Sequence, residues 1–267
     1  MNLRCVRALA VALCAAALAR PAGGQDMMRH VDLSSPEMTS AEMTRAEVET
    51  AVAAATTAKP ADFTGKRLSG LDLSGLDLSG AVLRAARLNK TNLAGAKLDR
   101  AVLDQAWLLE ADLRGASLKD ANLFATQMQR AKLDGADLSG ARVVADLTGA
   151  SLLGASFASA RMGADMKNQS MGLMRAVLTS AKLDRANLRG VDLSRADLEF
   201  ASLKDADLSD ALLTNADLSG ADFVGAAVTG ADFAGADLTS TRLAGAVGLD
   251  AAKNLDKAQN LNRAIRN

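Results

Sequence analysis

The stretch LSGLDLSGLDLSGAVL, residues 68–83, places a leucine at every fifth position. An amphipathic helix repeats its apolar residues about every 3.6 positions and a half-buried strand about every 2, so this period fits neither. The same unit continues on both sides, from residue 61 to residue 245, as two residues, a large apolar centre and two more. A repeat of this length predicts a solenoid in which every unit occupies an equivalent place.

The composition of the unit indicates how it folds. We count 37 units, whose centres are 28 Leu, 4 Phe, 3 Met and 2 Val, and alanine stands two positions before the centre in 29 of them. On an extended chain these two residues point the same way and the polar residue between them points out. The last two residues must turn the chain. Four such corners close a square after 20 residues, which gives about nine coils.

The unit resembles a known repeat. The sequence ADLSG occurs at residues 136–140 and 216–220, and with the neighbouring units it resembles the pentapeptide-repeat proteins. The resemblance covers residues 61–245. It implies an all-β solenoid, a right-handed quadrilateral β-helix with a narrow core of alanine and leucine.

Residues 1–19 have the features of a signal peptide. Arg4 and Arg7 precede an apolar run of eleven residues, 8–18, which is too short for the roughly 20 residues that span a bilayer. We expect export to the periplasm or the medium, with cleavage after Ala19 or, alternatively, after Gly24. The mature chain would then have no membrane span and no cysteine, since Cys5 and Cys14 both lie in this segment.

The segments flanking the repeat follow other patterns. Residues 20–60 are expected to be a flexible segment and a short helix, because residues 35–37 (SPE) and the pair Thr44 and Glu47 are helix-start patterns. Over residues 246–267 the period changes to six, which predicts short helical turns that cap the last coil. The leucines of this cap are Leu249, Leu255 and Leu261.

The spacing of the apolar centres slips between residues 143 and 173. It is four from Val143 to Leu147 and four from Met162 to Met166, then seven to Leu173. Because these changes cancel, we expect a bulge or a small projecting loop, through residues 167–170, on one continuous rod. A boundary between two rods is the less favoured alternative.

The sequence holds little that could do chemistry. It has one histidine, His30, no cysteine or histidine cluster with metal-ligand spacing, and no phosphate-binding or nucleophile-elbow motif. The many aspartates before the centres are typical of residues that bond to turn backbone. We therefore predict no enzyme activity, no cofactor and no metal.

Charge is uneven along the repeat, although the formal net charge of the chain is zero. Residues 191–240 carry ten acidic residues against two basic ones, whereas residues 81–133 carry nine basic against five acidic. With four units per coil, aspartates 20 residues apart would stack in one column, where their repulsion needs relief from water, cations or a partner. The candidate acidic contact residues are Asp197, Asp217, Asp222 and Asp237.

A second candidate surface is apolar. Trp107 and Phe124 are expected to point outward on adjacent coils and to form a patch there. Alternatively, Trp107 lies under Arg87, one coil away in the same column, in a cation–π contact.

Two functions fit these features. The first is an exported, non-catalytic scaffold that binds an unidentified protein through the outer faces of the solenoid, with no direct binding of nucleic acid. The alternative is a cytoplasmic regulator of a topoisomerase, because the pentapeptide-repeat proteins that shield DNA gyrase from quinolones are acidic rods that imitate DNA. The predicted export signal favours the first.

Overall fold

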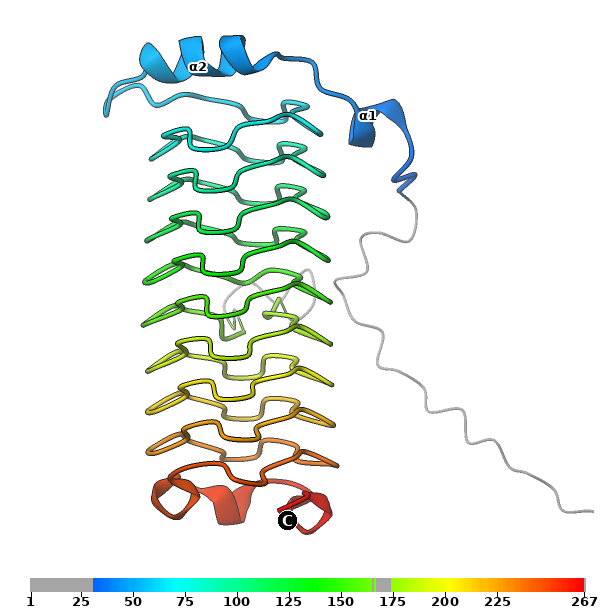
Figure 1. Ribbon diagram of the computed structural model, residues 1–267, viewed down its shortest axis with the longest axis vertical. Helices are drawn as coiled ribbons and strands as arrows, with labels where there is room; N and C mark the ends of the chain where they lie inside the picture. The colour runs from blue at the N-terminus through cyan, green and yellow to red at the C-terminus, as the bar shows by residue number, and fades with distance from the viewer. Residues whose placement is uncertain (1–30, 165, 167–173, 267) are drawn as a thin grey trace, which may run out of the picture.

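The computed structural model describes residues 31–164, 166 and 174–266, which form a rod of stacked coils (Figure 1). A helix lies across the N-terminal end of the rod, and three short turns lie across the other end. The helical elements are α1 (Pro36–Thr39), α2 (Arg45–Ala53), η1 (Leu249–Ala251), η2 (Leu255–Lys257) and η3 (Leu261–Arg263).

Parallel β-bridges join each coil to the next and define four outer faces. The usual bridge joins residues 20 positions apart, as between Asp197 and Asp217, so one coil is four five-residue units. Each side is an isolated bridge because a corner follows within two residues. We name the faces by their first and last bridged residues: face A from Asp62 to Lys253, face B from Arg67 to Gln259, face C from Asp72 to Ile265, and face D from Asp77 to Val247.

The core is a single column of apolar side chains on the rod axis. Of the 37 expected centres, 35 are buried with at most 1% of their surface exposed, including the four phenylalanines. Burial of one leucine contributes roughly 2 kcal/mol. Where threonine replaces the inward alanine, its hydroxyl donates to a carbonyl of the preceding coil, as Thr91 does to Leu68 over 2.8 Å. The narrow core therefore tolerates a polar atom only where the backbone satisfies it.

The corners orient the outer carboxylates. An aspartate on a face commonly accepts a hydrogen bond from the backbone N–H two residues later, as Asp217 does from Ser219 over 3.0 Å. This is the turn-forming bond expected of aspartate. As a consequence, the carboxylates of a face lean toward the corner that follows it. We call the corner after face B, which includes residues 199–200 and 219–220, corner B.

The N-terminal segment covers the open edge of the first coil. Ala41 forms an antiparallel bridge with Leu68, and Glu42 N–H donates to the carbonyl of Arg67 over 2.8 Å. The helix α2 begins after Thr44, whose side chain and that of Glu47 form the predicted capping box. Val48 of α2 is fully buried against the core. Helix and extended segment together protect a sheet edge that could otherwise pair with another chain.

The C-terminal segment continues the ladder with longer corners. Its bridges join Asp232 to Lys253, Asp237 to Gln259 and Arg242 to Ile265, so the separation grows from 21 to 22 and then 23 residues. The turns η1, η2 and η3 take up the additional residues. Their leucines pack half-buried against the core and cover the last coil.

The spacing of the buried centres around the register slip differs from the predicted spacing. Residues Gln127 and Asp146 bridge 19 positions apart, but Asp146 and Val177 bridge 31 apart, so the chain contains an insertion after Met162. Met166 was expected to be a buried centre, and this is wrong: 51% of its surface is exposed, because the next centre on the ladder is Leu178. The other expected centre, Leu173, and the predicted loop at residues 167–170 lie outside the described residues.

The ladder nevertheless passes the insertion without a break. Arg161 bridges to Asp192 on face A, and Asp146 bridges to Val177 on face B. Met174, on the returning part of the insertion, packs against Ala125 and Val144. The shortened corner at Val144 is thus in the same apolar cluster as Met174, where the insertion returns to the rod.

The predicted signal peptide, both cysteines and His30 fall within residues 1–30, which lie outside the described part of the chain. Among the residues that the structure describes, no helix has the length and apolar character needed to cross a bilayer.

Candidate protein-binding faces

Face B brings the predicted acidic residues together. Asp197 bridges to Asp217, and Asp217 bridges to Asp237, so the three occupy consecutive coils of one column. Neighbouring strands lie about 4.8 Å apart. Each carboxylate accepts a backbone N–H from corner B, at Glu199, Ser219 and Thr239 respectively.

The three aspartates differ in their other partners. Asp197 accepts from Arg175 over 3.1 Å and from the hydroxyl of Thr179, also over 3.1 Å. Asp237 accepts from the side-chain amide of Asn260 over 2.9 Å. For Asp217, in the middle, the contacts of the described residues include no cationic or amide side chain. The repulsion in this column is therefore relieved at its two ends and least at Asp217.

The environment of Asp237 stabilises its ionised form. Burial disfavours the charge, but hydrogen bonds from Asn260 and Thr239 outweigh it and hold the pKa of Asp237 below its usual value. Arg263, in η3, acts in the same direction. The carboxylate thus ties the C-terminal cap to face B.

Asp222 does not belong to this column. It lies on face C, between Ser202 and Arg242 in the ladder. Its carboxylate pairs with Lys204 at 3.4 Å and with Arg242 at 3.1 Å, and its side chain is largely buried. Two cations therefore surround one acid, and Asp222 adds little negative charge to the surface.

The predicted apolar patch is not an open surface. Phe124 packs against Ala125, Val144 and Met174, and the guanidinium carbon of Arg142 lies 4.2 Å from the centre of its ring. Trp107 is half-buried on face B, between Arg87 and Gln127 in the ladder. Met174, where the insertion returns to the rod, belongs to the cluster that packs against Phe124.

One exposed aromatic residue was not among the candidates predicted from the sequence. Phe200, at corner B, has 61% of its surface exposed, the largest fraction among the large apolar side chains that the structure describes. It lies three residues after Asp197, and its N–H donates to the carbonyl of Ser219 over 2.9 Å. The signal that could have revealed it is a large aromatic residue at a corner position otherwise occupied by small or polar residues.

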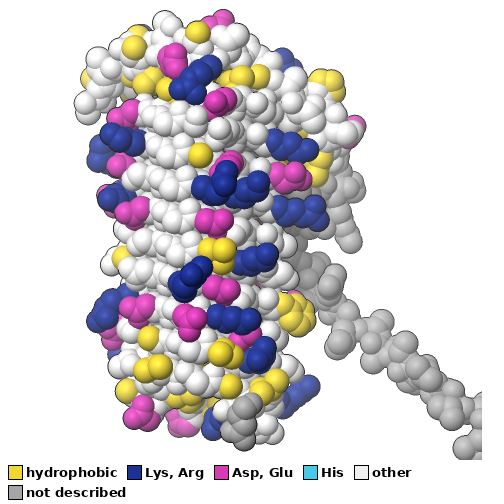
Figure 2. Space-filling model, in the orientation of Figure 1, with side chains coloured by type: hydrophobic (Ala, Val, Ile, Leu, Met, Phe, Trp, Pro, Cys, Tyr) yellow, Lys and Arg dark blue, Asp and Glu magenta, His cyan; other side chains and the backbone are white. Residues whose placement is uncertain are grey.

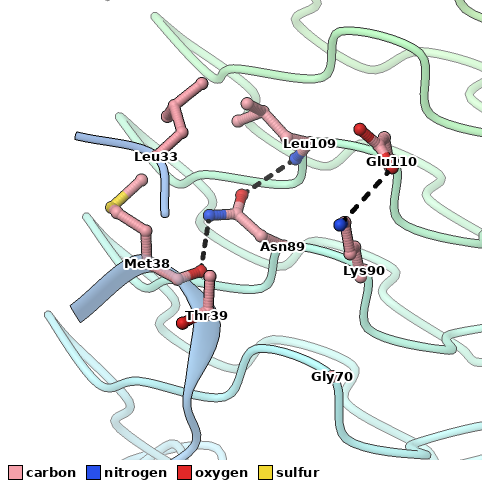
Figure 3. Close-up of a pocket in the computed structure, with 8 residues that line it drawn as sticks. All are labelled: Leu33, Met38, Thr39, Gly70, Asn89, Lys90, Leu109 and Glu110. Atoms are coloured by element: carbon pink, nitrogen blue, oxygen red, sulfur yellow. Dashed lines mark hydrogen bonds and ion pairs between the residues drawn. The ribbon is translucent and has the colours of Figure 1, made fainter. Parts of the chain in front are cut away.

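A small pocket lies at the opposite end of corner B, between α1 and the wall of the rod (Figure 3). Its volume is about 220 Å³, and Leu33, Met38 and Leu109 supply apolar walls. Asn89 crosses its floor, with its amide donating to the carbonyl of Met38 and its oxygen accepting from Leu109 N–H, both over 3.0 Å. Because both polar ends of Asn89 are used in this way, the pocket is best described as the seam that attaches α1 to the rod.

Charges of both signs are interleaved over much of the visible surface (Figure 2). No group of three or more histidine, cysteine, aspartate or glutamate side chains in the described ranges could hold a metal ion. The features that remain as candidates are long, continuous outer faces.

Comparison with known protein families identifies the family of this chain. The sequence model of the family of pentapeptide repeats, in eight copies, matches residues 67–105, 103–140, 173–210 and 211–247. The chain belongs to the pentapeptide-repeat family, whose members are generally non-catalytic structural or binding proteins. No curated protein sequence matches the chain.

The solved structures that are similar to it include HetL and QnrB1. HetL, a pentapeptide-repeat protein involved in the regulation of heterocyst differentiation in the cyanobacterium Nostoc, is 31% identical, with a TM-score of 0.51 over 84% of this chain and 95% of HetL. QnrB1, a plasmid-mediated fluoroquinolone resistance protein, is 19% identical, with a TM-score of 0.53 over 75% of this chain and 92% of that one. The likeness to QnrB1 concerns the fold alone.

Proposed function

We propose that the chain is an exported, non-catalytic module that binds another protein along face B of the solenoid. The observation that carries the proposal is that face B combines a column from Arg67 to Gln259, continuous past the insertion, with the stacked aspartates 197, 217 and 237. A flat wall of this kind offers a long contact surface to a macromolecule and no enclosed site for a small substrate.

The sign of the charged side chains on face B differs between its two ends, and this difference would set the orientation of a bound partner. Arg67 and Arg87 lie toward its N-terminal end, and Asp197, Asp217 and Asp237 lie toward its C-terminal end. A partner with the opposite gradient would be oriented by this field as it approaches. The contact should weaken as salt rises, because the Debye length is about 8 Å at physiological ionic strength.

The experiment is a chemical cross-link followed by recovery from the native compartment. The triple variant Asp197→Asn, Asp217→Asn, Asp237→Asn should keep its fold and recover less of the partner than wild type at low salt. A matched variant on face D, Asp207→Asn, should recover as much as wild type. Equal recovery by the triple variant would contradict the use of face B.

Export is tested separately. The mature N-terminus, sequenced by mass spectrometry from separated periplasm and cytosol, should begin at Arg20 or Gln25 in the exported fraction. An intact Met1 in the cytosol would contradict export and favour the alternative of a DNA-mimicking topoisomerase regulator. That alternative has less support, because Asp222 is paired with two basic side chains of the same chain and contributes little free charge.

A further inference from the structure

Phe200 occupies a corner conformation that glycine, alanine or a polar or charged residue adopts at the other corners of the described chain. Its φ is +57°, in the left-handed region, and among the described residues it is the only aromatic one with positive φ. Serine fills the same place one coil before and two coils after, at Ser180 and Ser240, and Gly220 fills it in between. The corner itself therefore has no need of an aromatic residue.

The ring is supported by the neighbouring coil. A Cβ atom on Gly220 would lie 2.5 Å from Cδ1 and 2.6 Å from Cε1 of Phe200, so one edge of the ring packs directly on the glycine backbone. Any larger residue at 220 would displace it. The other part of the residue, 61% of its surface, is exposed to solvent, while the packed edge of the ring supports its position.

Hydrogen bonds of corner B link the backbone of Phe200 to a carboxylate of face B. Asp197 and Asp217 accept hydrogen bonds from N–H groups of corner B, and the N–H of Phe200 bonds to Ser219, whose own N–H bonds to Asp217. The carboxylates of face B thus lean toward the corner from which Phe200 projects. Asp217 is the one among them without a cationic or amide partner in the described part of the chain.

We propose that Phe200 and Asp217 form a contact site for an arginine side chain on the partner protein. A guanidinium is planar and always charged, so one group can stack on the ring and donate to the carboxylate. Charge complementarity selects this occupant: a purely apolar partner would leave Asp217 unpaired, and an acidic one would be repelled by the column. The inference rests on the proposed function and names the chemistry of its partner.

The test uses a fluorescent peptide of alternating glycine and arginine and a second peptide with neutral citrulline in place of arginine. Binding to the full chain is measured by fluorescence anisotropy at low salt. Phe200→Ser, which installs the residue found at 180 and 240, should weaken binding of the arginine peptide about fivefold. Phe200→Leu keeps apolar bulk without the ring and should weaken it similarly, as should Asp217→Asn.

Leu212→Ser is the matched control, since Leu212 is another exposed apolar residue on a different face. It should bind like wild type, and the citrulline peptide should not bind. Wild-type affinity in Phe200→Ser or Phe200→Leu, no binding of the arginine peptide by wild type, or equal binding of citrulline would each overturn the proposal. In the cross-linking experiment, equal recovery of a partner by wild type and Phe200→Ser would remove this site while leaving the proposed function intact.

Discussion

Arg45 reaches over the first coil and places its Nη1 2.9 Å from the carbonyl oxygen of Asp72. Its Nη2 lies 3.2 Å from the carbonyl of Ser74. Both acceptors belong to the first side of face C, which has no preceding coil to supply backbone donors. A single guanidinium thus donates to the edge carbonyls of face C. On face B the backbone of Ala41 and Glu42 pairs with the corresponding edge.

Arg45→Ala should lower the free energy of unfolding by about 1–2 kcal/mol, because it leaves these carbonyls without their charged donor. The control is Arg84→Ala, since Arg84 pairs with the side chain of Asp104, at 3.5 Å, and is well exposed. Its loss should cost less than about 1 kcal/mol. Chemical denaturation compares them, and equal losses would contradict an edge-capping role for Arg45.

The inward and outward assignment is tested at adjacent residues. Leu113→Lys should destabilise the chain by more than about 4 kcal/mol, since an unpaired ammonium would be buried in an apolar column. Asp112→Asn, on the outside, loses an exposed pair with Arg114 and should cost less than about 1 kcal/mol. Similar melting temperatures for the two variants would show that the assignment is wrong.

The sequence predicts the regular part of this fold because the reason for the repeat is local. Each centre must be apolar to fill its layer, and the 20-residue coil places Asp197, Asp217 and Asp237 in one column, as the ladder has them. The sequence predicts a projecting loop in this region, but the length of the insertion could not be predicted in the same way. Met166 is apolar and stands at a tolerable distance from Met162, so spacing alone counts it as one more centre.

The candidate site depends on contacts between side chains that cannot be predicted from the five-residue repeat. Arg175 reaches Asp197 only because the insertion returns to the rod at that point, and Phe124 is covered for the same reason. The corner position of Phe200 indicates that the ring lies outside the core, but its packing on Gly220 of the next coil could not be predicted from the sequence.

Acid should weaken the attachment of the C-terminal cap. The pKa of Asp237 is lower in the folded chain than its ordinary value, so folding favours the ionised form. This stabilisation is complete above the ordinary value of about 4 and is lost as the pH falls through and below it. The difference in unfolding free energy between wild type and Asp237→Asn should therefore shrink from pH 6 to pH 3. A difference independent of pH would contradict the assignment.

The return of the insertion is tested with two methionines. Met174→Ser should expose the apolar contact with Ala125 and Val144 and speed hydrogen exchange at Val177, whose N–H bonds to Ala145 over 2.9 Å. Met166→Ser changes an exposed side chain and should leave this exchange rate unaltered. Equal exchange rates at Val177 in the two variants would argue against Met174 as an anchor.

The continuity of face B across the insertion is the central claim, and a disulfide tests it directly. In a chain with Cys5 and Cys14 removed, the pair Asp146→Cys and Val177→Cys should oxidise readily, because bridged residues of adjacent strands lie within the Cα separation of about 4.4–6.8 Å that a disulfide accepts. The comparison pair is Asp146→Cys with Met166→Cys, which an uninterrupted 20-residue register would bring together. Efficient cross-linking of residues 146 and 177, with little of 146 and 166, is the predicted result. The reverse preference would contradict the continuous face.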